Sequence, residues 1–247
     1  MIRAPKRRLI LGAAAAILLV IAAGCVILTL PTTTRQGINY QVTSHRIPLY
    51  IKLIDFFQRH FQQQHLANSI CEGKPSEVDC VLALFEWTHR NIPRTPEGRT
   101  IVDDHVTNIV IRGHGMSDQI ADVFATLSVY AGVPAFFKVL DDPAQSRHLV
   151  LAFAWLTGKW IPFDVENHVV FRNRQGELAG IDELLADSSL IQEQTAGKLV
   201  GELSYARYIS VRNLRPFTVP NPLRATLHQP WPRFRYELRR IVGLRRE

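Results

Sequence analysis

The first feature of the hydrophobic pattern is an unbroken apolar run, Leu9 to Leu30, which holds 22 residues and no charged side chain. As a helix it would be about 33 Å long, enough to cross the roughly 30 Å hydrocarbon core of a bilayer. Residues 1–8 carry four basic side chains and no acid, and such a flank stays in the cytoplasm. We therefore expect a single-pass membrane anchor over residues 9–30. Its N-terminus would be cytoplasmic, and the rest of the chain would lie outside, in a periplasm or at the cell exterior.

Two other interpretations of the apolar run stay open, a cleaved signal peptide and a lipoprotein signal. Ala22-Ala23-Gly24-Cys25 resembles a weak lipobox, in which the cysteine is acylated. However, the run is longer than the core of a typical signal peptide. It also continues past the cysteine as Val26-Ile27-Leu28, where a lipoprotein usually turns polar. Both features favour the retained anchor.

After the anchor, the pattern predicts a polar linker followed by a helix. Residues 31–47 form the linker, since Pro, Thr and Arg dominate its first half. From residue 48 to about 67, apolar side chains recur at spacings of three and four, with polar side chains on the other face. This spacing is typical of an amphipathic helix.

Two further helices are predicted, separated by an irregular polar segment at residues 94–115. The first begins at Ser76, has acids in its first turn, where they suit the helix dipole, and ends at Pro93. The second runs from Ser117 to Tyr130, where the apolar side chains share one face and a glycine follows.

The pattern then changes to strands. Thr157-Gly158 predicts a tight hairpin turn, and residues 181–186 predict a short helix. The expected strands are residues 135–140, 148–156, 159–165 and 168–171. Helices followed by a run of antiparallel strands indicate an α+β fold, with helices packed on an antiparallel sheet.

Charge divides the chain further. The net charge is +7, but the first eight residues contribute +4 and residues 212–247 contribute +7, so the region between them is mildly acidic. We expect four parts: the basic flank and anchor (1–30), the linker (31–47), one domain (48–211) and a basic C-terminal extension (212–247). Two basic ends without a nucleic-acid-binding motif give no reason to expect nucleic acid as a partner.

The cysteines and histidines predict no metal site and no cofactor. Cys71 and Cys80 flank a short polar stretch. Outside the cytoplasm they would form a small disulfide loop, and otherwise they would be two unpaired thiols. Asp103-Asp104-His105 together with His114 have the chemistry of metal ligands, but in an irregular loop such residues are usually solvated.

Three residues stand in the order that acyl transfer requires. A nucleophile at a helix N-terminus, a histidine on a strand and a carboxylate on the next strand can activate one another. Ser117 opens a predicted helix, His148 begins a strand and Asp164 ends the following one. Taken alone, Ser117 is also an ordinary N-cap residue, and Asp164 could simply close the hairpin.

The same residues carry a resemblance to a known family. The stretch from Gly115 to Ala121, Leu127 and Gly132-Val133-Pro134-Ala135 resemble the first half of the transglutaminase-like core motif, in which a cysteine stands where this chain has Ser117. The second half is similar as well, with His148 followed by Trp160-Ile161-Pro162-Phe163-Asp164. The resemblance covers residues 76–186 and implies a papain-like fold with Ser117, His148 and Asp164 as the catalytic positions.

The chain departs from the family at two places: serine replaces the cysteine, and Leu149-Val150 follows the histidine where an aromatic is frequent. A cysteine beside a histidine can exist as a thiolate, whereas a serine must lose its proton during attack. We therefore expect a non-catalytic module that binds a peptide, a protein or a cell-envelope polymer. An acyl-transfer enzyme (peptidase, amidase or transamidase) with a Ser-His-Asp triad and a structural partner in a membrane complex are the alternatives.

Other residues near the predicted nucleophile are candidates for the cleft. His114 lies three residues before Ser117, and Asp118 and Gln119 follow it directly. Trp87 belongs to the preceding helix, where core packing is the competing interpretation.

The C-terminal residues 231–246 mix aromatic and aliphatic side chains with arginines. Two interpretations stay open for this segment. It is either an amphipathic helix on anionic lipid, or a helix packed on the domain with a solvated basic face.

Overall fold

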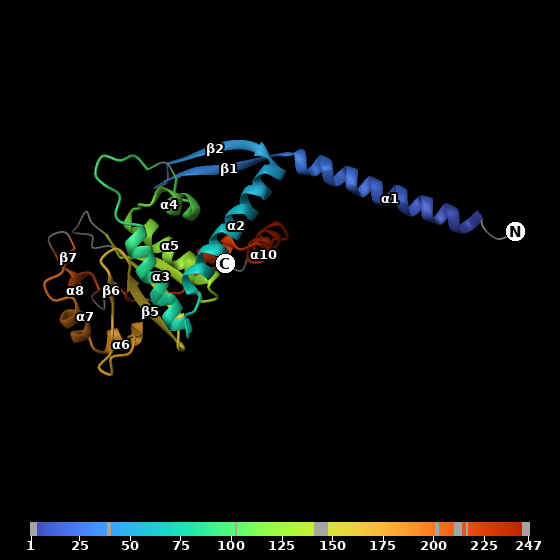
Figure 1. Ribbon diagram of the computed structural model, residues 1–247. Coiled ribbons are helices and arrows are strands. Elements are labelled where there is room, and N and C mark those ends of the chain that lie inside the picture. The colour runs from blue at the N-terminus through green and yellow to red at the C-terminus, as the bar shows by residue number, and fades with distance from the viewer. Residues whose placement is uncertain are drawn as a thin grey trace. The chain divides into compact units, whose positions relative to one another are not determined.

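The computed structural model (Figure 1) is α+β, as expected, and falls into two compact units, Met1–Gln58 and Arg59–Glu247. It describes residues 4–38, 41–101, 103–140, 148–200, 203–209, 214–215 and 217–243.

The first unit contains the N-terminal helix α1 (Ala4–Thr29). Its segment Leu11–Thr29 is long and apolar enough to cross a membrane, as an anchor or a signal sequence would be. A hairpin of β1 (Pro31–Ile38) and β2 (Gln41–Pro48) follows. The segment expected to be a linker is therefore a hairpin, in keeping with its threonines, valine and isoleucine, which favour extended backbone. Helix α2 (Leu49–Cys71) begins in this unit and continues into the second one.

Three helices open the second unit after α2. The predicted helix at Ser76 is confirmed as α3 (Glu77–Asn91), with the serine hydroxyl accepting the Asp79 N–H at 3.1 Å. The prediction for residues 94–115 was wrong in one part, since they include α4 (Val106–Arg112). The His105 ring caps this helix, and Gly113 ends it in the left-handed region with φ 72°. Helix α5 (Ser117–Tyr130) has the predicted bounds.

The sheet has four antiparallel strands in chain order, which are β3 (Ala135–Leu140), β4 (Leu149–Leu156), β5 (Lys159–Asp164) and β6 (Val169–Val170). Thr157 and Gly158 have φ values of 51° and 79°. Two consecutive positive φ angles are what a tight primed hairpin turn requires, so the predicted turn is confirmed.

Both faces of the sheet are buried, which explains the continuous apolar run of β4. Val150 and Ala152 belong to the core shared with α3 and α5. Leu149 and Leu151 point to the other face, into a second core. Figure 1 shows the elements of that second core in orange beside the sheet. They are α6 (Ile181–Ala186), α7 (Ser189–Gln194), β7 (Leu199–Val200), β8 (Leu203–Ser204) and α8 (Tyr205–Tyr208). Of these elements, only α6 was predicted.

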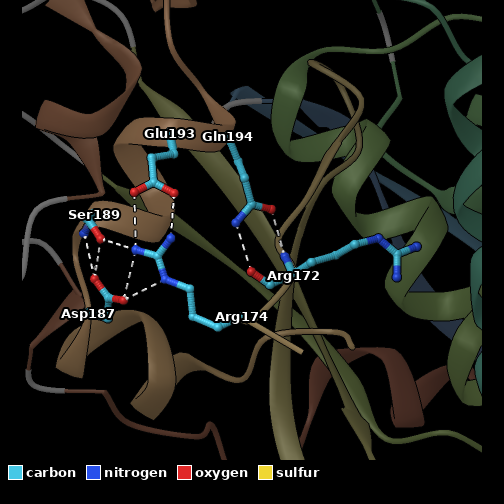
Figure 2. Close-up of polar contacts among 6 residues, drawn as sticks. All are labelled: Arg172, Arg174, Asp187, Ser189, Glu193 and Gln194. Carbon is cyan, nitrogen blue, oxygen red and sulfur yellow. Dashed lines mark hydrogen bonds and ion pairs between the residues drawn. The ribbon is translucent and has the colours of Figure 1, made fainter. Parts of the chain in front are cut away.

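The turn after β6 is fastened to α7 by two arginines (Figure 2). The Arg174 guanidinium donates to both Glu193 oxygens, at 2.7 and 3.1 Å, and to Ser189 at 2.6 Å. The Gln194 amide takes the place of a neighbouring strand, because it accepts the Arg172 N–H and donates to the Arg172 carbonyl, both at 2.8 Å.

A disulfide joins Cys71 at the end of α2 to Cys80 in α3, with 4.7 Å between the Cα atoms. It closes the short polar loop between the two helices, so both ends of that loop are covalently fixed.

Part of the region expected to be a C-terminal extension packs on the domain. The 3-10 helix η1 (Arg224–His228) packs on α5, and its Ala225 is buried in the first core. Arg224 forms an ion pair with buried Asp122 of α5 at 3.0 Å. Beyond η1, the structure ends in helix α10 (Pro230–Ile241).

The Asp122–Arg224 pair predicts a pH-dependent stability. Burial raises the pKa of Asp122 from 3.8 to about 6, and Arg224 opposes this rise. Between these two pH values the folded protein binds more protons than the unfolded chain, so its free energy of unfolding falls as pH rises from about 4 to about 6. Arg224→Gln removes the opposing charge. We expect it to lower the free energy of unfolding by about 1–3 kcal/mol at pH 7.5, and by much less at pH 4.5.

Urea unfolding at the two pH values measures both free energies. Arg224 also lies 5.9 Å from the centre of the Phe137 ring, so the double variant Asp122→Asn/Arg224→Gln is the control, and it should recover most of the loss at pH 7.5. An equal loss at both pH values would mean that the arginine acts through packing.

Candidate functional site

The three predicted catalytic positions lie at one end of the layer formed by α5 and the sheet. Strand β3 follows α5 after a short connection and packs against it. If β3 runs back along α5, the end of β3 at Leu140, with its partner Leu149, corresponds to the first turn of α5. Strand β5 is antiparallel to β4 and ends at Asp164 near that same edge. The fold therefore brings Ser117, His148 and Asp164 to a common end.

Ser117 is the first residue of α5, but it does not occupy the capping position. Met116 is the N-cap residue, with an extended backbone. The Gln119 side-chain oxygen accepts the Met116 N–H at 3.0 Å, and so covers the helix N-terminus. The Ser117 hydroxyl is half-buried and accepts a hydrogen bond from Arg94 Nη1 at 3.3 Å. The interpretation of Ser117 as an ordinary N-cap is therefore wrong.

Arg94 is a site residue that the sequence analysis missed. Its backbone forms a parallel bridge with Gly115, in which the Thr95 N–H donates to the Gly115 carbonyl at 2.8 Å. The same guanidinium nitrogen that contacts Ser117 also forms an ion pair with Glu166. Arg94 thus links the first turn of α5 to the turn after β5. No local pattern signals this contact, because its partners lie 23 and 72 residues away.

Asp164 is fully buried and accepts three hydrogen bonds. Its Oδ1 accepts the Asn167 N–H at 2.9 Å, and its Oδ2 accepts the Asn167 amide at 2.8 Å and the Tyr205 hydroxyl at 2.6 Å. Burial raises the pKa of this carboxyl, while the hydrogen bonds from Tyr205 and Asn167 oppose the rise. The carboxylate closes the turn after β5, which was the competing interpretation of this residue.

The side chain of Asp164 lies on the face of the sheet away from α5. Its ladder neighbour Val169 and its partner Tyr205 both belong to the second core, whereas Phe163 belongs to the core that includes α5. The two-residue turn pairs odd-numbered with even-numbered residues, so His148 and Asp164 cannot share a face of a regular ladder.

His148 is exposed and lies directly before β4, at the end of the sheet where α5 begins. By alternation with Val150, its side chain corresponds to the face that α5 covers. The catalytic roles of Ser117, His148 and Asp164 stay a prediction.

Two other imidazoles lie over the turn after Asp164. The His89 and His168 rings stack, with centroids 4.4 Å apart. His89 donates through Nδ1 to the Val165 carbonyl at 2.9 Å, and His168 Nε2 donates to Glu86 at 2.7 Å. His168 adopts φ 55°, which is uncommon for a side chain with a Cβ atom. The sequence analysis missed both residues, because only the tertiary fold joins them.

Two of the candidate cleft residues are engaged in internal hydrogen bonds. His114 is buried and bonds to the Thr95 hydroxyl at 3.1 Å. Burial, and after it the charges of Arg112 and Arg99, lowers the pKa of this histidine. Gln119 is buried between Met116, Arg112 and Asp104.

The other two candidates are half-buried. Asp118 is the second residue of α5, and Trp87 packs against the first core from α3. Within the described part of the chain, no group of three His, Cys, Asp or Glu side chains is arranged to hold a metal ion.

The segment that holds Ser117, His148 and Asp164 is similar to a known protein family. Residues 64–165 match the family model of the transglutaminase-like superfamily. A proposed cysteine protease from Cytophaga hutchinsonii is 18% identical, with a TM-score of 0.38, over 51% of this chain and 45% of that one. A proposed protease from Parabacteroides distasonis is 12% identical, with a TM-score of 0.32, over 53% of this chain and 35% of that one. The chain thus spans less than half the length of these two structures. No curated protein matches.

The capping geometry at α5 predicts different costs for two neighbouring substitutions. Ser117→Ala should change the free energy of unfolding by less than about 0.5 kcal/mol, because Gln119 covers the helix N-terminus. Gln119→Ala should cost about 1–3 kcal/mol, because it leaves buried polar partners unsatisfied. Urea unfolding at pH 7.5 measures both. A cost above 1 kcal/mol for Ser117→Ala would return the serine to a structural role.

Proposed function

Because residues 64–165 form a transglutaminase-like domain, we propose that this protein is a membrane-anchored, extracytoplasmic module that binds peptide or cell-envelope polymer without acyl transfer. The binding site is the surface around Ser117 and Arg94, at the first turn of α5.

The environment of Asp164 carries this proposal. A triad needs a carboxylate that orients the histidine and stabilises its protonated form. The Asp164 oxygens instead accept hydrogen bonds from Asn167 and Tyr205, on the face of the sheet away from α5. A serine that cannot pre-ionise depends on that assistance more than a cysteine does. The replacement of the cysteine and the environment of the carboxylate therefore support the same conclusion.

The side chains near Ser117 suit a polar polymer that carries carboxylates. Arg94 is exposed and presents its guanidinium beside the serine hydroxyl. A guanidinium recognises carboxylates by paired hydrogen bonds, so a ligand carboxylate would displace Glu166 from Arg94. Peptides and the peptide stems of cell-envelope polymers carry such groups, together with amides that a hydroxyl can hold.

Two features support a location outside the cytoplasm. Helix α1 has the length and composition of a membrane span, and basic residues precede it. The Cys71–Cys80 disulfide belongs to an oxidising compartment. The basic flank then stays in the cytoplasm while the domain lies on the other side of the membrane.

A second candidate is acyl transfer by Ser117, and one contact favours it. The Arg94 guanidinium, 3.3 Å from the serine oxygen, would stabilise an alkoxide or the oxyanion that follows attack. In this case His148 takes the serine proton, and a full Ser-His-Asp triad would also require the Asp164 side chain to leave Tyr205 and Asn167 and to reach the other face of the sheet.

Three forms of the protein separate the two functions: wild type, Ser117→Cys and Ser117→Ala. Each is incubated with a panel of peptides and amides and followed by mass spectrometry. We expect no turnover by wild type or Ser117→Ala. Turnover by Ser117→Cys alone would show that the missing thiol is what keeps the natural protein from acyl transfer. Peptide binding by wild type, weakened by at least tenfold in Arg94→Gln, would support the module. Wild-type turnover that Ser117→Ala abolishes would establish the enzyme instead.

Anchoring is tested in membranes of cells that express the full chain with a C-terminal tag. We expect the protein to resist alkaline carbonate extraction and to be digested by protease added from the extracytoplasmic side. Loss of about 2–3 kDa from the N-terminus, with release into the soluble fraction, would identify a cleaved signal. Residues 9–30 are the span that must be removed for that result.

A further inference from the structure

Helix α10 has an apolar arc along its length. Placed 100° apart around the axis, four side chains fall within an arc of about 100°. These are Trp231, Phe234, Leu238 and Ile241. Trp231 and Phe234 stack with their ring centres 5.7 Å apart. The helix is therefore amphipathic, with an aromatic N-terminal half and an aliphatic C-terminal half.

This arc faces away from the domain. The exposed fractions are 59% for Trp231, 56% for Phe234, 48% for Leu238 and 78% for Ile241. The less exposed residues of the helix include Tyr236 and Glu237, which lie outside the arc. An amphipathic helix that stabilises a domain buries its apolar side. Here that orientation is reversed, so the helix contributes little to the core.

Basic residues border the arc. Arg235 and Arg239 follow it on one side, and Arg235 lies over the Trp231 ring at 4.8 Å. On the other side Glu237 borders the arc, and Arg233 and Arg240 lie beyond it, close together toward the back of the helix. Glu237 is the one acid in the helix and pairs with Arg233 at 2.7 Å and with Arg240 at 3.1 Å. The helix therefore has a net charge of +3.

We propose that α10 is an interfacial helix that lies on an anionic lipid surface with its apolar arc among the acyl chains. Helices that bind anionic lipid have Trp, Phe and Leu on one side and basic residues on the other. Arg235 and Arg239 border the arc, where a long side chain reaches headgroup phosphates while its stem stays among the chains. The inference rests on the proposed anchoring in one respect only, since the anchor keeps the domain close to a bilayer.

A second copy of the chain fits this face less well than lipid does. Pairing two arcs would bring two helices of charge +3 together, with Arg235 and Arg239 of each at the rim. Like charges at the rim of an interface oppose association. An anionic membrane removes this opposition and covers the apolar arc at the same time.

The test uses the full chain in liposomes of phosphatidylcholine alone or with phosphatidylglycerol at about one third of the lipid. Brominated lipids quench a tryptophan that enters the acyl region. The Trp231→Phe variant supplies the background from the other tryptophans. We expect quenching of Trp231 in anionic vesicles, little in neutral ones, and a decrease as salt rises toward 1 M. Arg235→Gln/Arg239→Gln should reduce the bound-to-free ratio of the helix by about fivefold for each charge removed.

The matched control is Lys74→Gln/Arg90→Gln, which removes two exposed cations elsewhere and should leave the quenching unchanged. Leu238→Gln/Ile241→Gln should abolish it, and the exposure of both residues makes misfolding an inadequate explanation. Absence of quenching in anionic vesicles would overturn the proposal. Equal quenching in both lipids would remove the role of charge. Dimers that Leu238→Gln/Ile241→Gln dissociates would assign the face to a second copy.

If the N-terminal segment proves to be cleaved, the mature protein is added to the same vesicles from outside. Retained quenching then supports the interfacial helix even though the anchor has failed. Membrane anchoring without quenching would support the anchor and overturn the interfacial helix. The two proposals can therefore fail separately.

Discussion

The burial of α5 is the constraint on which the second unit depends. Every residue from Gln119 to Tyr130 is buried, so this helix has no solvent face. The sheet covers one side, while α3, α4 and η1 pack against the others. Burial on all sides restricts how this helix can shift, and its first turn, at Ser117 and Asp118, is the half-buried part of it. Because Ser117 lies in this first turn, its hydroxyl is placed to accept a hydrogen bond from Arg94, which also pairs with Glu166 in the turn after β5.

Most of the elements around this helix follow from local patterns. The bounds of α5, α6 and the central strands could be predicted because turn residues separate the apolar runs, and Thr157-Gly158 determined the hairpin. Helix α4 could not be predicted, because its seven residues depend on a histidine cap and a left-handed glycine. The hairpin of β1 and β2 was mistaken for a linker because its side chains are mostly polar and exposed.

The candidate site shows a different limit. Motif spacing predicted Ser117, His148 and Asp164 as site residues, and the strand order is compatible with their lying toward one end of the sheet. The face on which Asp164 lies depends on the hairpin register, and this could have been derived from the two-residue turn. Arg94, His89 and His168 could not have been found in this way. Their contacts join segments that are far apart in the chain, and local periodicity carries no information about such pairs.

The Gln194 amide has a consequence for the free edge of the sheet. Strand β6 is the last strand in the order and has only two residues. Open N–H and C=O groups at such an edge are a template on which another chain can add a strand. Gln194 occupies both backbone groups of Arg172, two residues after β6 ends. A side chain thus ends the hydrogen-bond ladder within the molecule, and these two backbone groups are not open to a strand of another chain.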